Sequence, residues 1–151
     1  MGYPQEFFVA DGSFRDLCIL DADLADWQRL LSSLSLLKWP VFFSTTYSRE
    51  PSELPGSARE LFEELALDSE ESATLAIQAD GIWFTCYFFE VEEIEFTFDP
   101  VDVVDEASFG MLERFMKWLG DTCGKEVRMT MEGTDHPSMP ALFTYSPPIQ
   151  R

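Results

Sequence analysis

Basic residues are scarce in this sequence of 151 residues, which contains 10 Lys and Arg against 28 Asp and Glu and carries a formal net charge of -18. Between Arg59 and Arg114 there is no Lys or Arg at all. A surface this anionic repels the phosphates of nucleic acids and of acidic lipids. We therefore expect neither a nucleic-acid nor a membrane partner, and a basic protein is the partner that the charge suits.

Histidine and cysteine, which serve as zinc ligands and in nucleophile–base pairs, are also few. The chain has one histidine, His136, and its three cysteines, Cys18, Cys86 and Cys123, include no Cys-x-x-Cys pair. Such spacing provides neither a zinc-ligand set nor a disulfide framework. The Gly-x-Gly-x-x-Gly, His-Glu-x-x-His and Gly-x-Ser-x-Gly motifs are absent as well. We expect no catalytic residue, no metal site, no cofactor, three buried cysteines, and a histidine exposed in a turn-rich loop.

Long apolar runs are missing too, because no stretch approaches the 18 or more apolar residues that a membrane-spanning helix needs. The first residues are acidic rather than basic, which argues against a secretory signal, so we expect a cytoplasmic protein. What the chain does have is apolar content: 46% of its residues are hydrophobic and 14 are Phe. This is enough for one core, and we expect a single domain over residues 1–151.

Helices are indicated in three places. Apolar residues recur at helical spacing over residues 23–37 and again over residues 106–123, where Gly124 provides a C-terminal stop. A shorter helix should follow Ser57, which stands three residues before Glu60 as in a capping box. The acidic group Asp21, Asp23 and Asp26 runs straight into the first helix without the glycine of a calcium loop, so these residues are expected to cap it.

Strands are indicated by runs of β-branched and aromatic residues and by period-two alternation. A hairpin should open the chain, with strands at 7–10 and 14–20, and a loop should span 48–56. The other expected strands cover residues 39–47, 73–78, 82–91, 94–98, 127–131 and 142–145. The resulting fold class is α+β: a single domain with a mainly antiparallel sheet, residues 82–91 as an interior strand, and two or three helices packed on one face.

The aromatic residues of the interior strand fall on two faces. Phe84 and Phe88 have the spacing of core residues, whereas Trp83, Tyr87 and Phe89 point the opposite way. That second face must be covered either by the helices or by a partner.

The candidate binding residues are acidic and lie in the strand at 94–98 and its flanks. Glu93 and Glu95 alternate with buried-type residues, which indicates an acidic row facing water. Beside outward aromatics, this row suits fast association with a basic protein partner. The expected partner-binding residues are Glu90, Glu92, Glu93, Glu95, Asp99, Asp102 and Asp105.

The end of the chain resembles that of many small bacterial α+β proteins. The residues that carry this resemblance are Leu119-Gly120, Gly124-Lys125-Glu126-Val127, Thr130, Glu132, Pro140 and Tyr145-Ser146-Pro147. The whole chain, short, acidic and rich in aromatics, is similar in kind to immunity proteins of bacterial polymorphic-toxin systems. That likeness implies a non-enzymatic protein-binding module that inhibits a basic toxin.

Two other classes stay open at this point. Type III secretion chaperones are similar in size, acidity and α+β dimer construction, which leaves a homodimer open, but they begin with a helix whereas this chain is expected to begin with strands. An enzyme of unknown type is the third class, and it should show a concave pocket containing titratable groups with shifted pKa values.

Overall fold

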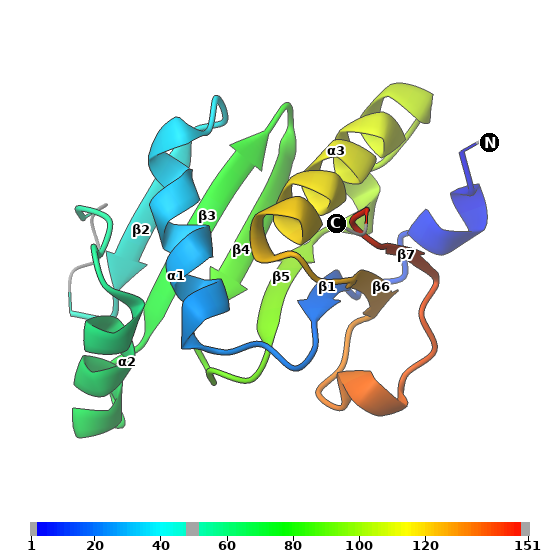
Figure 1. Ribbon diagram of the computed structural model, residues 1–151. Coiled ribbons are helices and arrows are strands. Elements are labelled where there is room, and N and C mark those ends of the chain that lie inside the picture. The colour runs from blue at the N-terminus through cyan, green and yellow to red at the C-terminus, as the bar shows by residue number, and fades with distance from the viewer. Residues whose placement is uncertain (1–2, 48–51, 149–151) are drawn as a thin grey trace.

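A seven-stranded, entirely antiparallel sheet forms the framework of the computed structural model, which describes residues 3–47 and 52–148 (Figure 1). The strand order is β2-β3-β4-β5-β1-β6-β7, so the first strand of the chain lies between the fifth and the sixth. The strands are β1 (Arg15–Ile19), β2 (Val41–Thr45), β3 (Ala73–Ala79), β4 (Ile82–Tyr87), β5 (Ile94–Phe98), β6 (Val127–Met131) and β7 (Phe143–Tyr145). The α+β class and the interior position of β4 are confirmed.

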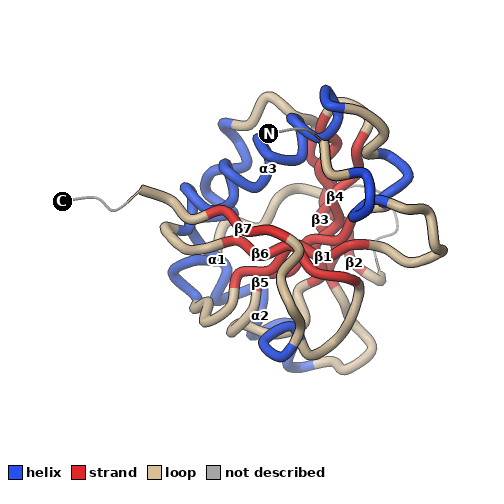
Figure 2. The backbone as a smooth tube through the Cα atoms, turned by 90° about the vertical axis from the view of Figure 1, so that its right-hand side faces the viewer, coloured by secondary structure: helices blue, strands red, loops and turns tan. Residues whose placement is uncertain are grey.

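Three α-helices lie on one side of the sheet (Figures 1 and 2). They are α1 (Leu24–Ser33), α2 (Ala58–Leu67) and α3 (Glu106–Cys123), and short 3-10 turns are η1 (Gln5–Phe8), η2 (Leu34–Leu36), η3 (Pro100–Asp102) and η4 (His136–Ser138). Asp23 and Asp26 form the expected capping box of α1, whereas Asp21 stands before the cap with a φ of 55°. The Ser57 side chain accepts a hydrogen bond from the Glu60 N–H at the start of α2. Gly124 ends α3 with a φ of 67°, in the left-handed region that glycine tolerates.

The core lies between this helical layer and the sheet. Phe84, Phe96 and Leu75 point inward from the strands and are fully buried. Phe115 of α3 stacks on Phe84 and meets Phe96 edge-on, while Trp27 of α1 packs on Phe88. The three cysteines are buried, as the sequence indicated.

The N-terminal segment differs from the expected hairpin. Residues 7–10 do not form a strand, because the chain makes the 3-10 turn η1 and then bends back over the start of β1. The buried guanidinium of Arg15 fixes this path by donating hydrogen bonds to the carbonyls of Phe7, Val9 and Phe14. Those carbonyls accept hydrogen bonds from a side chain rather than from a partner strand. Phe8 is therefore buried in the core from a turn and not from a strand.

Strand β4 is shorter than the expected 82–91. It ends at Tyr87, although Phe88 keeps the alternation and packs in the core on Trp27 and Phe43. Of the expected loop at 48–56, residues 48–51 lie outside the described residues. Within the described ranges, no helix is long and apolar enough to cross a membrane.

Candidate functional site

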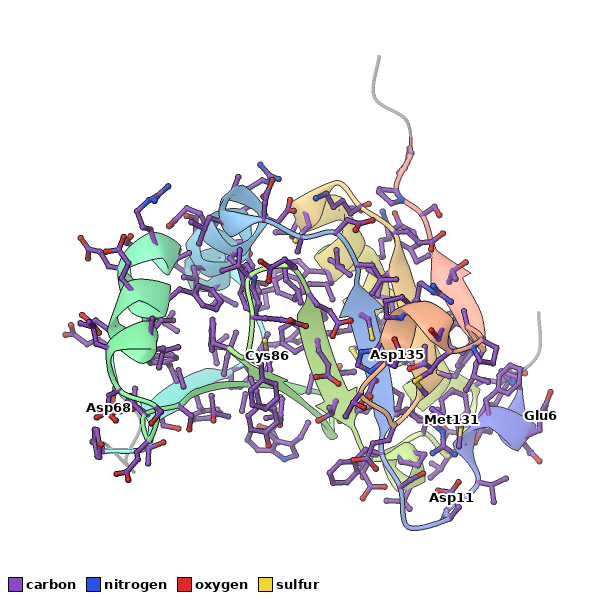
Figure 3. All side chains as sticks on the ribbon, turned by 90° about the horizontal axis from the view of Figure 1, so that it is seen from below. Glu6, Asp11, Asp68, Cys86, Met131 and Asp135 are labelled. Carbon is purple, nitrogen blue, oxygen red and sulfur yellow. The ribbon has the colours of Figure 1, made fainter. Side chains whose placement is uncertain are left out.

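The face of the sheet opposite the helices carries exposed aromatic side chains. Along β4, Phe84 and Cys86 point into the core, while Trp83 and Tyr87 are 44% and 38% exposed on the other side. Phe42 of β2 contacts the Trp83 ring, and Phe89, 73% exposed, stacks on Tyr87. We call Phe42, Trp83, Tyr87 and Phe89 the aromatic face. Viewed from below, side chains extend from the bare side of the sheet while the helices lie on the other (Figure 3).

The same side of the sheet holds a buried cluster around the single histidine. His136 is 2% exposed, so the expectation of an exposed loop histidine is wrong. Its Nε2 lies 2.8 Å from Oδ2 of Asp16 and 3.3 Å from Oε1 of Glu95, and its Nδ1 lies 3.0 Å from Oε2 of Glu93. We call Asp16, Glu93, Glu95 and His136 the histidine–carboxylate cluster.

The cluster is built from segments that are distant in the sequence. Strand alternation brings Asp16 of β1 and Glu95 of β5 to the same side of the sheet. The segment 133–142, which contains η4, covers them and delivers His136. Three bonds hold that segment in place: the Gly133 N–H donates to Asp16, Arg128 donates to the Met139 carbonyl, and the Leu142 N–H donates to the Met129 carbonyl. Asp135, at the start of η4, is labelled in Figure 3.

The ionisable groups of the cluster shift one another's pKa values. Burial, together with the neighbouring Asp16 carboxylate, raises the pKa of Glu95 to about 7. Burial alone would lower the pKa of His136, but the hydrogen bonds to Asp16 and Glu93 outweigh it and raise that pKa above its ordinary value. Asp16 is 1% exposed, and its Oδ1 accepts no hydrogen bond from any residue that the structure describes. A buried oxygen without a partner is unusual in a folded protein.

A small open pocket joins the cluster to the aromatic face. It encloses about 150 Å³ between the Tyr87 and Phe89 rings on one side and Glu93, Glu95 and His136 on the other. A neighbouring hollow of about 260 Å³ reaches Asp16 past Thr97, Glu132 and Thr134. Polar groups of the cluster can therefore be reached from solvent through the aromatic face.

The arrangement does not support nucleophilic catalysis by the nearby thiol. Cys18 lies in the same cluster region as Glu93 and His136, but it is fully buried. Burial and the surrounding carboxylates raise its pKa far above the ordinary value, and a thiol that stays protonated is a poor nucleophile.

The acidic residues proposed from the sequence fall into three groups. Glu90 and Glu92 are exposed in the β4–β5 connection, and Glu90 lines the pocket. Glu93 and Glu95, expected to face water, have side chains only 16% and 17% exposed and contact His136. That part of the expectation is corrected, because the segment 133–142 covers the strand end.

The third group lies at the other end of β5, roughly 16 Å of extended chain away. There Asp99 accepts a hydrogen bond from the Val101 N–H, and Asp105 caps α3. Asp102 belongs to η3. The antiparallel register of β4 and β5, in which Thr85 pairs with Thr97, continues to Trp83 and Asp99, so Asp99 lies at the Trp83 end of the aromatic face.

Sequence reasoning missed Asp16 and His136 as partners. One signal was available: Asp16 stands in the apolar strand run at 14–20, where a carboxylate that becomes buried needs a partner. Nothing in the local sequence identified His136, 120 residues later, as that partner.

Comparison with known proteins gives a likeness of fold. No family model matches the chain, and no curated protein sequence does. The fold is similar to a chain of the 1.75 Å crystal structure of the toxic C-terminal tip of CdiA from Pseudomonas aeruginosa in complex with immune protein. The TM-score is 0.50 at 12% identity, over 87% of this chain and 94% of that one. At this identity the likeness concerns the fold.

Proposed function

We propose that this protein is a non-enzymatic binding module that inhibits a protein toxin, as immunity proteins do. The observation that carries the proposal is the aromatic face, an exposed apolar patch on the side of the sheet opposite the three helices. Large rings that are exposed and paired in this way are typical of binding surfaces rather than of the surface of a monomer.

The chemistry of the surface favours a basic partner. Glu90, Glu93 and Glu95 line the pocket beside Phe89, and Glu132 lines the adjoining hollow. A second copy of the chain would bring another net charge of -18 against this one, so a homodimer through this face is disfavoured. A type III secretion chaperone-like dimer is less favoured for the same reason.

The fold comparison supports the same class. The similar chain comes from a crystal structure of a toxic C-terminal tip in complex with immune protein. A fold of this kind therefore occurs in a toxin–immunity complex. The pocket that holds Glu95 and His136, both with raised pKa values, is the feature expected of an enzyme. An enzyme that uses a cysteine nucleophile is less favoured, because Cys18 is buried and burial raises the pKa of its thiol.

The two kinds of residue should have different roles in binding. Exposed aromatic rings that become buried act as anchors and determine the dissociation rate. Exposed carboxylates such as Glu90 and Glu92 act at longer range and accelerate association, an effect that salt weakens.

The test begins with the protein encoded next to this gene, expressed alone and together with this chain in a bacterial host. We expect the neighbouring protein to arrest growth alone, and the arrest to be relieved when both are made. The purified pair should bind directly, and Trp83→Ala with Phe89→Ala should raise the Kd at least about 100-fold, since truncating two anchors costs roughly 3 kcal/mol or more.

Leu36→Ala with Leu67→Ala provides the matched control. These leucines are 85% and 87% exposed but lie in η2 and at the end of α2, away from the aromatic face. They should leave the Kd unchanged. A neighbouring protein that is harmless and does not bind, or binding that the leucine pair weakens as much as the aromatic pair does, would overturn the proposal.

A further inference from the structure

We propose that Asp16, Glu95 and His136 form a binding site for a divalent transition-metal ion of the Zn²⁺ type. The three residues come from β1, β5 and η4, and the ligand atoms they offer lie within 4.8 Å of one another. The proposal replaces the sequence-based expectation of no metal, which rested on a single histidine and scattered cysteines.

The spacing of the donor atoms fits a coordination shell. Ligands about 2.0–2.2 Å from a tetrahedral Zn²⁺ lie roughly 3.3–3.5 Å from one another. Nε2 of His136 is already 3.3 Å from Oε1 of Glu95 and 2.8 Å from Oδ2 of Asp16. An increase of about half an ångström in the His136–Asp16 distance would bring it into the same range.

The unpartnered oxygen of Asp16 is the second observation that points to a cation. Asp16 is almost wholly removed from water, yet its Oδ1 has no hydrogen-bond donor within the described part of the chain. A bound cation would take the place of the proton that a protonated Glu95 shares with Asp16.

Glu93 fixes the imidazole in the orientation that a ligand needs. Its carboxylate lies 3.0 Å from Nδ1 of His136, and Nε2 lies 2.8 Å from Asp16 and 3.3 Å from Glu95. A metal ion would take the place of the Nε2 proton between these groups, while Nδ1–H donates to Glu93. A carboxylate behind a metal-binding histidine is the usual supporting partner in such sites.

The donor set also selects the metal. One imidazole and two carboxylates suit Zn²⁺ or Mn²⁺, whereas Mg²⁺ and Ca²⁺ favour shells of oxygen alone. The hollow of about 260 Å³ that contacts Asp16 and Glu95 provides an entry path and room for water at the remaining positions. Bound metal would tie the segment 133–142 to β1 and β5 beside the aromatic face.

The experiment uses the full chain stripped of metal with a chelator and then titrated with ZnCl₂ in a calorimeter. We expect one equivalent to bind and the Tm to rise on binding, with no comparable effect of MgCl₂. Asp16→Asn and Glu95→Gln should each weaken zinc binding by about tenfold or more, since loss even of a supporting partner has an effect of that size.

Glu90→Gln and Glu132→Gln are the matched controls, because these carboxylates line the same hollows but do not contact His136. They should leave zinc affinity unchanged. If Asp16→Asn does not fold, Glu95→Gln and the wild-type titration still decide the matter. No binding by wild-type protein, or equal weakening by the control variants, overturns the site.

Cys18→Ala separates this ligand set from the other one that the cluster offers. The Sγ of Cys18, a carboxylate oxygen of Glu93 and a ring nitrogen of His136 also lie within 4.8 Å of one another. With the assigned ligands, Cys18→Ala keeps zinc affinity, and Co²⁺ in place of zinc shows no thiolate charge-transfer band. Loss of binding in Cys18→Ala, with binding retained in Asp16→Asn, would overturn the assignment.

Discussion

Phe84 of β4 and Phe115 of α3 stack with their ring centroids 3.8 Å apart and their planes 5° from parallel. Both rings are fully buried, and Phe115 also meets Phe96 and Trp118. This contact is the centre of the layer that joins the longest helix to the sheet.

Phe115→Ala should therefore reduce the free energy of unfolding by about 3–5 kcal/mol, because it removes buried surface and leaves a cavity. Urea denaturation followed by circular dichroism measures the change. Phe89→Ala, on the exposed face, should change it by less than about 0.5 kcal/mol. Similar losses in the two variants would contradict the assignment of core and surface.

Gly110 within α3 and Gly124, which caps its C-terminus, should respond to alanine with opposite changes in stability. Gly124 has a φ of 67°, so Gly124→Ala should destabilise the protein by about 1 kcal/mol. Gly110 lies in the helix and a Cβ there would meet nothing within 4 Å, so Gly110→Ala should stabilise it by up to about 1 kcal/mol. The Tm of each variant, compared with that of the wild type, measures the change. A Tm shift of the same sign in both variants would contradict the left-handed conformation assigned to Gly124.

Asp26 should make stability depend on pH in the acid range. Burial alone would raise its pKa, but hydrogen bonds from Lys125, at 2.6 Å, and from Arg29 outweigh burial and hold the pKa below its usual range. Because the folded pKa is lower than the unfolded one, the stabilisation is full above the unfolded value and is lost as pH falls through the folded value.

Asp26→Asn should thus lower the free energy of unfolding by about 1–3 kcal/mol at pH 7, the range for hydrogen bonds to charged groups. The difference from wild type should shrink as the pH is lowered below about 4. Urea denaturation at pH 7, 5 and 3 measures it. A difference that stays constant with pH would show that the charge of Asp26 contributes nothing.

Charge reversal should separate the half-buried acids from the exposed ones. Glu95→Lys places a cation against His136 and should lower the Tm by roughly 5–10 °C, as a loss of about 2–3 kcal/mol does in a domain of this size. Glu90→Lys, in the exposed connection, should shift the Tm by less than about 2 °C. Equal shifts would place Glu95 in water, as the alternation of the sequence first indicated.

The three thiols should be unreactive in the folded protein. Cys18, Cys86 and Cys123 are buried, and burial raises the pKa of each, that of Cys123 to about 12. Ellman's reagent should titrate fewer than about 0.2 thiols per chain within minutes under native conditions. In 8 M urea it should titrate all three. A rapidly reacting native thiol would contradict the packing of that strand or helix.

Most of the framework could be predicted from the sequence, because local pattern and burial agree along it. The helix at 106–123 and the alternation of Trp83 and Tyr87 with Phe84 and Cys86 were readable from spacing alone. The turn around Phe7 could not be predicted, because its apolar residues have the pattern of a strand. Only the structure shows that the Arg15 guanidinium donates hydrogen bonds to the carbonyls of Phe7 and Val9.

The candidate site was predictable only in part, for the same physical reason. Alternation correctly placed Glu95 on the side away from the core, but alternation says nothing about what covers that side. The cover is a loop that arrives about 40 residues later and brings His136 to a distance of 3.0 Å from Glu93. Contacts between such distant segments leave no periodic trace in the sequence.

The placement of β1 between β5 and β6 also determines how the molecule is made. Arg15 pairs with Phe98 on one side and with Met131 on the other, so the first strand to leave the ribosome waits for partners that are synthesised much later. The meander of β2, β3 and β4 can form from neighbouring residues in the meantime. Until β6 emerges, the nascent chain carries an unpaired hydrophobic edge at β1, open to pairing with another chain. The sheet can therefore be completed only after β6 has been synthesised, and we expect a chain stalled before Val127 to aggregate.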